Sequence, residues 1–136
     1  MFNLGAEASF DEGDGQIQSR YYPVRQYNKD KHEKYWVDFF ILADAKYSFI
    51  YHLVVYQGKN KANVNIHHSI RNLPTTQKAV VNAILKSGIS NDINRCHHIF
   101  MDNCYAAPQL ITLMLTNYNS RALGTCKANR IGFESD

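Results

Sequence analysis

The sequence predicts one α/β domain, in which helices flank a mixed five-stranded sheet. Two observations predict this class: apolar segments of strand length alternate with longer segments of helical periodicity, and turn-forming residues separate them. The 136 residues (1–136) are typical of a single domain, without repeats or low-complexity tracts. The hydrophobic content of 45% is typical of a globular protein, and no apolar stretch reaches the roughly 18 residues of a membrane span, so no membrane partner is expected.

The first three strands are predicted from an acidic island and two apolar runs. A first strand is expected at Phe10, next to the acidic segment 11–14. Residues 37–43 and 49–56 are rich in aromatic and β-branched side chains, and the segment between them begins with Asp44, a typical turn residue. This pattern predicts an antiparallel hairpin.

Two helices are predicted, and a proline precedes each of them. After Pro74, apolar side chains recur at helical spacing, which indicates a helix over about 75–87 that ends before Gly88. Pro108 opens a second apolar helix, expected over 109–116.

Two more strands complete the predicted sheet. Residues 99–101 form a short apolar run that ends at Asp102, and a last strand is expected over 120–126. The order of elements, a strand, a hairpin, a helix, a strand, a helix and a strand, is that of a ribonuclease-H-like sheet. In that topology the first and fourth strands are neighbours. Asp11 and Asp102 are therefore expected to face each other, where they can hold a divalent metal ion for phosphodiester chemistry.

Basic and aromatic residues alternate between the first strand and the hairpin. The net charge of +3 is by itself no evidence for a nucleic-acid partner. Five basic residues nevertheless fall within residues 20–34, interleaved with tyrosines. They are Arg20, Arg25, Lys29, Lys31 and Lys34, with Tyr21, Tyr22 and Tyr27 between them. This pattern predicts a phosphate-contacting strip, and the alternative is a solvated loop whose long side chains cover apolar surface.

Short motifs along nearly the whole chain carry a family resemblance. They are Phe10-Asp11-Glu12-Gly13, Ser19-Arg20, Gln26-Tyr27-Asn28-Lys29-Asp30-Lys31, Lys34-Tyr35, Val55-Tyr56-Gln57-Gly58-Lys59, Asp102-Asn103-Cys104-Tyr105 and Gly124-Thr125-Cys126-Lys127-Ala128-Asn129-Arg130. In this order and at these spacings they resemble the motifs of piggyBac-type transposases.

The resemblance implies a catalytic core that cuts and joins DNA with two divalent metal ions, Mg²⁺ or Mn²⁺, held by three aspartates. Asp11 matches the first of these aspartates and Asp102 the second. The third lies, in the family, well beyond the last motif and has no counterpart before Asp136, so the fold is expected to be incomplete at its C-terminus. Glu134 is interpreted as surface charge rather than as a substitute. Because two carboxylates replace three, we expect weak binding of a single metal ion at most, and no strand transfer.

The resemblance also implies DNA as the partner and the nucleus as the location. The candidate DNA contacts are Arg20, Lys34, Lys59, Asn129 and Arg130. Where the family tends to carry glycine and lysine, this chain has Trp36 and Asp38, and the reversed charge at Asp38 weakens the predicted DNA contact. A sheet face without its usual covering helices is expected to expose apolar surface and to favour self-association.

The leading interpretation is a transposase remnant that retains the first two metal-ligand positions and is inactive alone. One alternative is a domesticated DNA-binding or protein-interaction module in which the acids are relics. Another is an incomplete gene model of a longer, active transposase.

Histidines and cysteines suggest a rival chemistry. Adjacent histidines occur at 67–68 and 97–98, but neighbouring residues of a strand point to opposite faces, so each pair can give only one ligand to a zinc site. We therefore interpret them as structural or surface residues. Cys104 is interpreted as a packing residue rather than a nucleophile. The three cysteines leave one unpaired in any disulfide scheme, which favours a reducing compartment.

Overall fold

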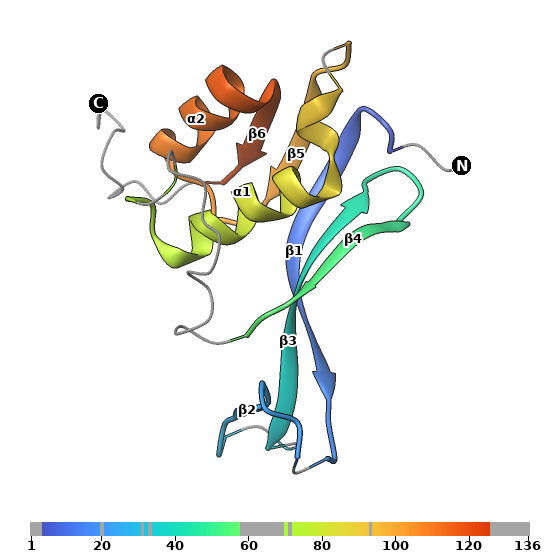
Figure 1. Ribbon diagram of the computed structural model, residues 1–136, viewed down its shortest axis with the longest axis vertical. Coiled ribbons are helices and arrows are strands. Elements are labelled where there is room, and N and C mark those ends of the chain that lie inside the picture. Colours follow the sequence, from blue (N-terminus) through green and yellow to red (C-terminus); the bar gives the residue numbers. More distant parts are fainter. Residues whose placement is uncertain are drawn as a thin grey trace.

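The computed structural model describes residues 4–19, 21–30, 32, 34–57, 70, 72–92 and 94–125. Within these residues, two α-helices lie beside the upper part of one six-stranded sheet (Figure 1). Two of the strands continue beyond the helices toward the lower end of the molecule.

The predicted strands and helices are confirmed, with one strand more than expected. The strands are β1 (Glu7–Gln16), β2 (Gln26–Tyr27), β3 (Tyr35–Asp44), β4 (Ile50–Val55), β5 (His97–Met101) and β6 (Ser120–Gly124). The helices are α1 (Thr75–Ser87) and α2 (Pro108–Tyr118), and a short 3-10 helix, η2 (Ile89–Asn91), follows α1. The additional strand is β2, whose two residues are too few for an alternating pattern to be recognised in a sequence.

The sheet has the predicted mixed topology. Its strand order is β2-β3-β1-β5-β6, and β4 pairs with β3. β1, β3 and β4 pair antiparallel, whereas β5 runs parallel to β1 and β6 parallel to β5. Since β1 occupies one edge of β3, both β2 and β4 lie along the other edge, at different positions.

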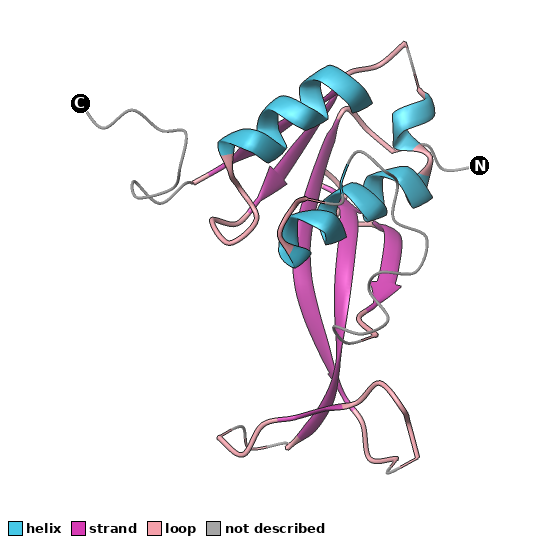
Figure 2. Cartoon of the chain, turned by 60° about the vertical axis from the view of Figure 1, so that its left-hand side comes forward, coloured by secondary structure: helices cyan, strands magenta, loops and turns pink. Residues whose placement is uncertain are grey.

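β1 pairs over different lengths with its two neighbours. It pairs with β5 only over Glu7 to Phe10, but with β3 from Ala8 to Gln16. β1 and β3 therefore leave the body of the domain together as a projecting ribbon (Figure 2). We name this projection the arm, and it comprises residues 13–16 of β1, residues 35–39 of β3, β2, and the described residues between β1 and β3.

Both helices pack on one face of the sheet. They contribute to a single hydrophobic core with every second residue of the central strands. The helical residues are Val80, Val81, Ala83, Ile84, Leu110, Met114 and Tyr118, and the strand residues are Ala8, Phe10, Leu42, Ile99, Met101 and Ala122. Each fully buried aliphatic side chain stabilises the fold by roughly 1.5–3 kcal/mol, so this face holds most of the apolar stabilisation.

The opposite face of the sheet is not covered by α1 or α2. Exposed apolar side chains lie on it in alternation with the core residues, with exposed fractions of 50% for Ile50, 44% for Leu53, 41% for Phe100 and 42% for Leu123. The apolar exposure expected on one face of the sheet is therefore present among the described residues. No helix among the described residues has both the length and the apolar character needed to cross a membrane.

The predicted ends of α1 have the expected geometry. Pro74 precedes the first turn, and Gly88 follows the last one with a φ of 78°, a left-handed conformation that glycine adopts without a Cβ clash. Asn119, the residue that follows α2, also takes a positive φ of 46°. Local sequence signals thus define the limits of both helices.

Asp44 organises the turn between β3 and β4, as predicted. One carboxylate oxygen, Oδ1, accepts hydrogen bonds from the backbone N–H groups of Tyr47 at 2.8 Å and Lys46 at 3.0 Å, and Oδ2 accepts one from Gly5 at 2.9 Å. The hydrogen bonds from Tyr47, Gly5 and Lys46 hold the pKa of this buried carboxyl below its usual value of 3.8. Asp44 therefore joins the N-terminal segment to the hairpin.

We expect Asp44→Asn to flatten the acid dependence of stability. A carboxyl whose pKa is lower in the folded than in the unfolded state contributes stability that is complete above about pH 5 and is lost as pH falls through the folded pKa. The free energy of unfolding from urea titrations between pH 3 and pH 7 should decrease at low pH in the wild type. It should change less in Asp44→Asn, which should already be less stable at pH 7. Glu7→Gln, at an exposed carboxylate of β1, is the control and should keep the wild-type slope. An unchanged slope in Asp44→Asn would contradict this role.

Candidate functional site

Asp11 and Asp102 lie at the point where β5 separates from β1. The last residue pair of the parallel ladder is Phe10 with Met101, and the two aspartates are the next residues of their chains. Neighbouring strands are about 4.8 Å apart, so the backbones of the two aspartates are close. Asp11 was predicted near the end of its strand, but it lies in the middle of β1, because pairing with β3 continues into the arm.

The two carboxylates belong to the same face of the sheet. Phe10 and Met101 are buried toward the helices, and side chains alternate along a strand, so Asp11 and Asp102 belong to the opposite face. Both aspartates are exposed. The partner of Asp11 across the β1–β3 ladder is Ile41. The site is thus open to solvent.

Each aspartate also makes a local hydrogen bond. Asp11 Oδ1 accepts from the backbone N–H of Glu12 at 2.8 Å, and Asp102 Oδ1 accepts from the backbone N–H of Asn103 at 2.6 Å. The Cys104 thiol lies 3.6 Å from Asp102 Oδ2. Because the backbone orients one oxygen of each group, both carboxylates are partly held in place before any ligand binds.

A contact between Tyr105 and Glu12 supports the site and was not predicted from the sequence. Tyr105 is fully buried, its ring packs edge-on against Phe10 with centroids 5.0 Å apart, and its hydroxyl donates to Glu12 Oε1. Burial and the Glu12 carboxylate raise the pKa of Tyr105 well above its usual range, so the hydroxyl remains a donor. The backbone N–H of Tyr105 donates to the Asp102 carbonyl at 3.1 Å. Tyr105 therefore connects Glu12, the residue after Asp11, to the turn that carries Asp102.

Gly124 lets β6 approach β5 closely beside the site. It pairs with Met101, and a Cβ at position 124 would overlap with the Met101 carbonyl oxygen and lie 3.1 Å from the Ala106 Cβ. Only glycine fits there without displacing the backbone immediately before Asp102. The signal for this constraint was present in the sequence, since Gly124 begins the last of the quoted motifs.

The structure agrees with the prediction for His97 but not with that for Cys104. His97 is buried, with Nδ1 3.0 Å from the Gly5 carbonyl oxygen and Nε2 3.9 Å from the Asp92 carboxylate, which agrees with a structural interpretation. Cys104, predicted to be a packing residue, is exposed, because it lies in the open turn after β5. Partial desolvation and the nearby Asp102 carboxylate raise the pKa of its thiol, which disfavours the nucleophilic thiolate.

Only one of the five predicted DNA contacts falls within the described residues. Lys34 is exposed and lies in the arm, whereas Arg20, Lys59, Asn129 and Arg130 lie outside the described part of the chain, as do Glu134 and Asp136. Among the described residues, no three of the His, Cys, Asp and Glu side chains lie close enough together to hold a metal ion.

A family model described as Transposase IS4 matches residues 1–135. The chain belongs to this transposase family. Among solved structures, its fold is similar to that of a piggyBac transposase, determined by cryo-electron microscopy as a synaptic complex with hairpin DNA. The TM-score is 0.74 at 20% sequence identity, over 97% of this chain. At the level of the fold, this similarity confirms the predicted resemblance to piggyBac-type transposases and the predicted ribonuclease-H-like sheet.

This transposase domain spans 25% of the length of that piggyBac chain. No curated protein matches its sequence.

We expect Tyr105→Phe to destabilise the transposase domain by about 1–2 kcal/mol, because it leaves the Glu12 carboxylate without its buried donor. Urea unfolding followed by the fluorescence of Trp36 would measure the change. Tyr27→Phe, which removes a hydroxyl from a tyrosine that is 58% exposed, is the matched control and should be close to neutral. Equal effects of the two substitutions would contradict the proposed role of Tyr105.

Proposed function

We propose that this transposase-derived domain supplies Asp11 and Asp102 as the first two carboxylates of a divalent-metal site for DNA cleavage and joining. The supporting observation is the register of β1 and β5, in which the two aspartates directly follow the last parallel pair. Their common exposed face leaves room for a phosphodiester. The similar solved structure is itself a transposase in complex with DNA.

The two side chains have the right chemistry for Mg²⁺ or Mn²⁺. Both ions prefer carboxylate oxygens and water as ligands, and the exposed positions of Asp11 and Asp102 admit both water and phosphate. A bound metal would neutralise charge that develops on the phosphodiester. The chain itself contributes two carboxylates, which the paired strands hold close together.

A second metal ion is disfavoured on this chain alone. Two divalent ions about 4 Å apart repel each other by about 17 kcal/mol, a raw Coulomb energy at an effective dielectric constant near 20. Two carboxylates offset less of that repulsion than three, and no third acid among the described residues joins them in a group that could hold a metal ion. We therefore propose weak binding of one metal ion and no strand transfer by the isolated chain.

DNA is the proposed partner, and the nucleus the proposed location. Lys34 in the arm is the one candidate contact within the described residues. The further candidate contacts are Arg20, Lys59, Asn129 and Arg130. The second candidate function, a DNA-binding module with relic acids, is favoured by the exposed basic and aromatic residues of the arm. Metal binding distinguishes the two functions.

Titration with Mn²⁺, followed by electron paramagnetic resonance, tests the proposed site. Asp11→Asn and Asp102→Asn should each weaken Mn²⁺ binding at least about tenfold, because each removes a charged ligand. Asp14→Asn is the matched control: Asp14 is also an exposed aspartate of β1, but it belongs to the opposite face of the strand, so binding should not change. Binding that survives both substitutions unaltered would reject the pair as ligands and leave the relic interpretation.

We also propose that the uncovered face of the sheet drives self-association. Replacing Leu53 and Leu123 together by threonine should shift the sedimentation coefficient toward that of a monomer, because it removes exposed apolar area from that face. Leu115→Thr is the control, since Leu115 is 52% exposed but lies on α2. A wild-type protein that sediments as a clean monomer at high micromolar concentration would overturn this expectation.

A further inference from the structure

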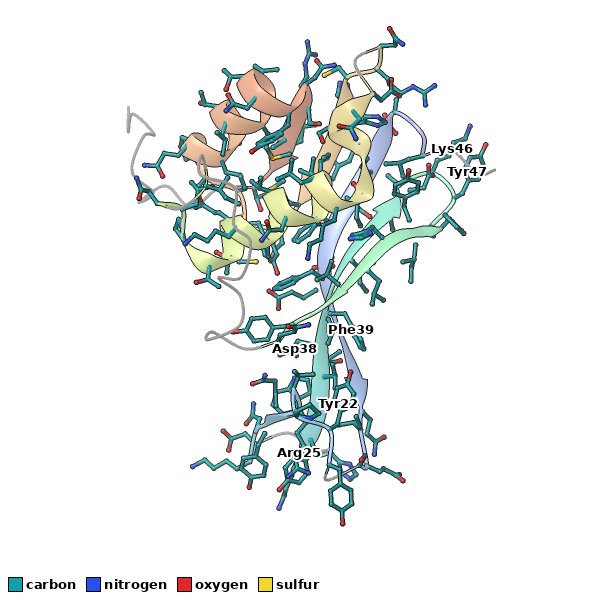
Figure 3. The ribbon with its side chains drawn as sticks, viewed as in Figure 1. Tyr22, Arg25, Asp38, Phe39, Lys46 and Tyr47 are labelled. Carbon is teal, nitrogen blue, oxygen red and sulfur yellow. The ribbon has the colours of Figure 1, made fainter. Side chains whose placement is uncertain are left out.

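The arm carries a group of aromatic side chains that no core requires. Tyr21 is 87% exposed, Tyr27 58%, Tyr35 41% and Tyr22 38%. Exposed basic side chains, Lys29 and Lys34, lie in the same part of the chain. Figure 3 shows Tyr22 and Arg25 in the arm, well away from the helices. A cluster of exposed tyrosines and cations on a projecting ribbon is typical of a binding surface.

Three of these residues form an ordered group. Tyr27 lies directly opposite Tyr35 in the β2–β3 ladder, and their ring centroids are 5.2 Å apart. The Arg25 guanidinium carbon lies 4.5 Å from the centroid of the Tyr35 ring. No carboxylate among the described residues forms an ion pair with Arg25 or Lys34. Within that part of the chain, no paired acid therefore neutralises the charge of either cation.

The aromatic group continues the face on which Asp11 lies. Tyr35 is separated from Ile41, the partner of Asp11, by six positions along β3 (41 minus 35), so strand alternation assigns both to the same face. The opposing acids of the arm, Asp14 and Asp38, pair with each other on the other face, where Trp36 Nε1 also donates to Asp38 Oδ1. The negative charge of Asp38, expected to weaken DNA contact, is therefore turned away from this path.

The distance between the two sites suits a nucleic acid. Six residues of extended strand span about 20 Å, which is the length of about six base pairs of B-DNA. A DNA strand whose phosphate lies at Asp11 and Asp102 can therefore span the distance to the tyrosines of the arm.

We propose that the arm binds a single-stranded segment of DNA next to the processed phosphodiester. Unpaired bases stack on Tyr21, Tyr27 and Tyr35, while Arg25 and Lys34 contact the phosphates. Stacking on side chains favours single strands, since the ring faces of bases in a duplex are already covered by the neighbouring base pairs. This inference rests on DNA being the substrate of the proposed function.

The test uses the full 136-residue chain in EDTA, with a fluorescently labelled 12-nucleotide oligo-dT and a 12-base-pair duplex as probes. Anisotropy gives both affinities, and the fluorescence of Trp36, the single tryptophan, reports on the arm itself. Tyr27→Leu and Tyr21→Ser should each weaken oligo-dT binding at least about fivefold, and Tyr27→Phe should restore it. Lys34→Gln should lower the slope of log affinity against log salt by about 0.7.

The chain contains a matched control at the other end of β3. Lys46 lies over the ring of Tyr47, 5.1 Å from its centroid, in the turn between β3 and β4, and Tyr47 is 65% exposed. Figure 3 shows this pair far from Tyr22 and Arg25. The double substitution Lys46→Gln with Tyr47→Leu removes one cation and one exposed tyrosine, the two kinds of side chain that are also substituted in the arm. It should leave oligo-dT binding unchanged.

The outcomes separate this inference from the proposed metal site. Asp11→Asn and Asp102→Asn should bind oligo-dT as the wild type does in EDTA, and the arm variants should bind Mn²⁺ normally. Equal affinity for oligo-dT and duplex, or equal losses in the arm and the control variants, would overturn the inference. So would unchanged oligo-dT binding in Tyr27→Leu. If the wild type binds oligo-dT as expected but does not bind Mn²⁺, the result would instead count against the proposed function and leave this inference standing.

Discussion

The unequal pairing of β1 with its two neighbours determines most of this structure. The parallel ladder with β5 stops at Phe10, whereas the antiparallel ladder with β3 continues to Gln16. Asp11 and Asp102 are the first residues beyond the end of the ladder with β5, so their backbones lie side by side. Where the ladder with β3 continues, the arm is formed. The candidate metal site and the candidate DNA surface therefore arise from the same strand, and their separation is set by its length.

Support for the site comes from residues on both of its sides. On the helix side, Tyr105 packs on Phe10 and donates to Glu12, so the turn after β5 is held against β1. At the edge, Gly124 allows β6 to pair with Met101 immediately before Asp102. These contacts fix the backbone but leave the carboxylates exposed, as the proposed binding of a phosphodiester requires. Apolar side chains on the same face, among them Phe100 and Leu123, are exposed as well.

The sequence predicted the elements whose signals are local. Pro74 and Gly88 mark the limits of α1 because their backbone preferences act within one turn, and the adjacency of Asp11 and Asp102 followed from topology alone. The arm was missed because residues 12–16 are polar or glycine, which is typical of a loop. They form a strand because β3 supplies their hydrogen-bond partners from 20 or more positions away. The Tyr105–Glu12 contact and the exposure of Cys104 likewise depend on tertiary structure.

Charge distribution explains how acids and a polyanion can share one face. At the end of the β5 ladder, Asp11 and Asp102 repel a phosphate unless a metal ion lies between them, so these residues alone give DNA no affinity. The cations of the arm lie about 20 Å away, beyond the Debye length of about 8 Å at physiological salt. Their attraction for DNA is therefore largely independent of the repulsion at the acids. In the proposed arrangement, the arm would retain a strand without metal, and the metal would determine only whether the phosphate binds between the two aspartates.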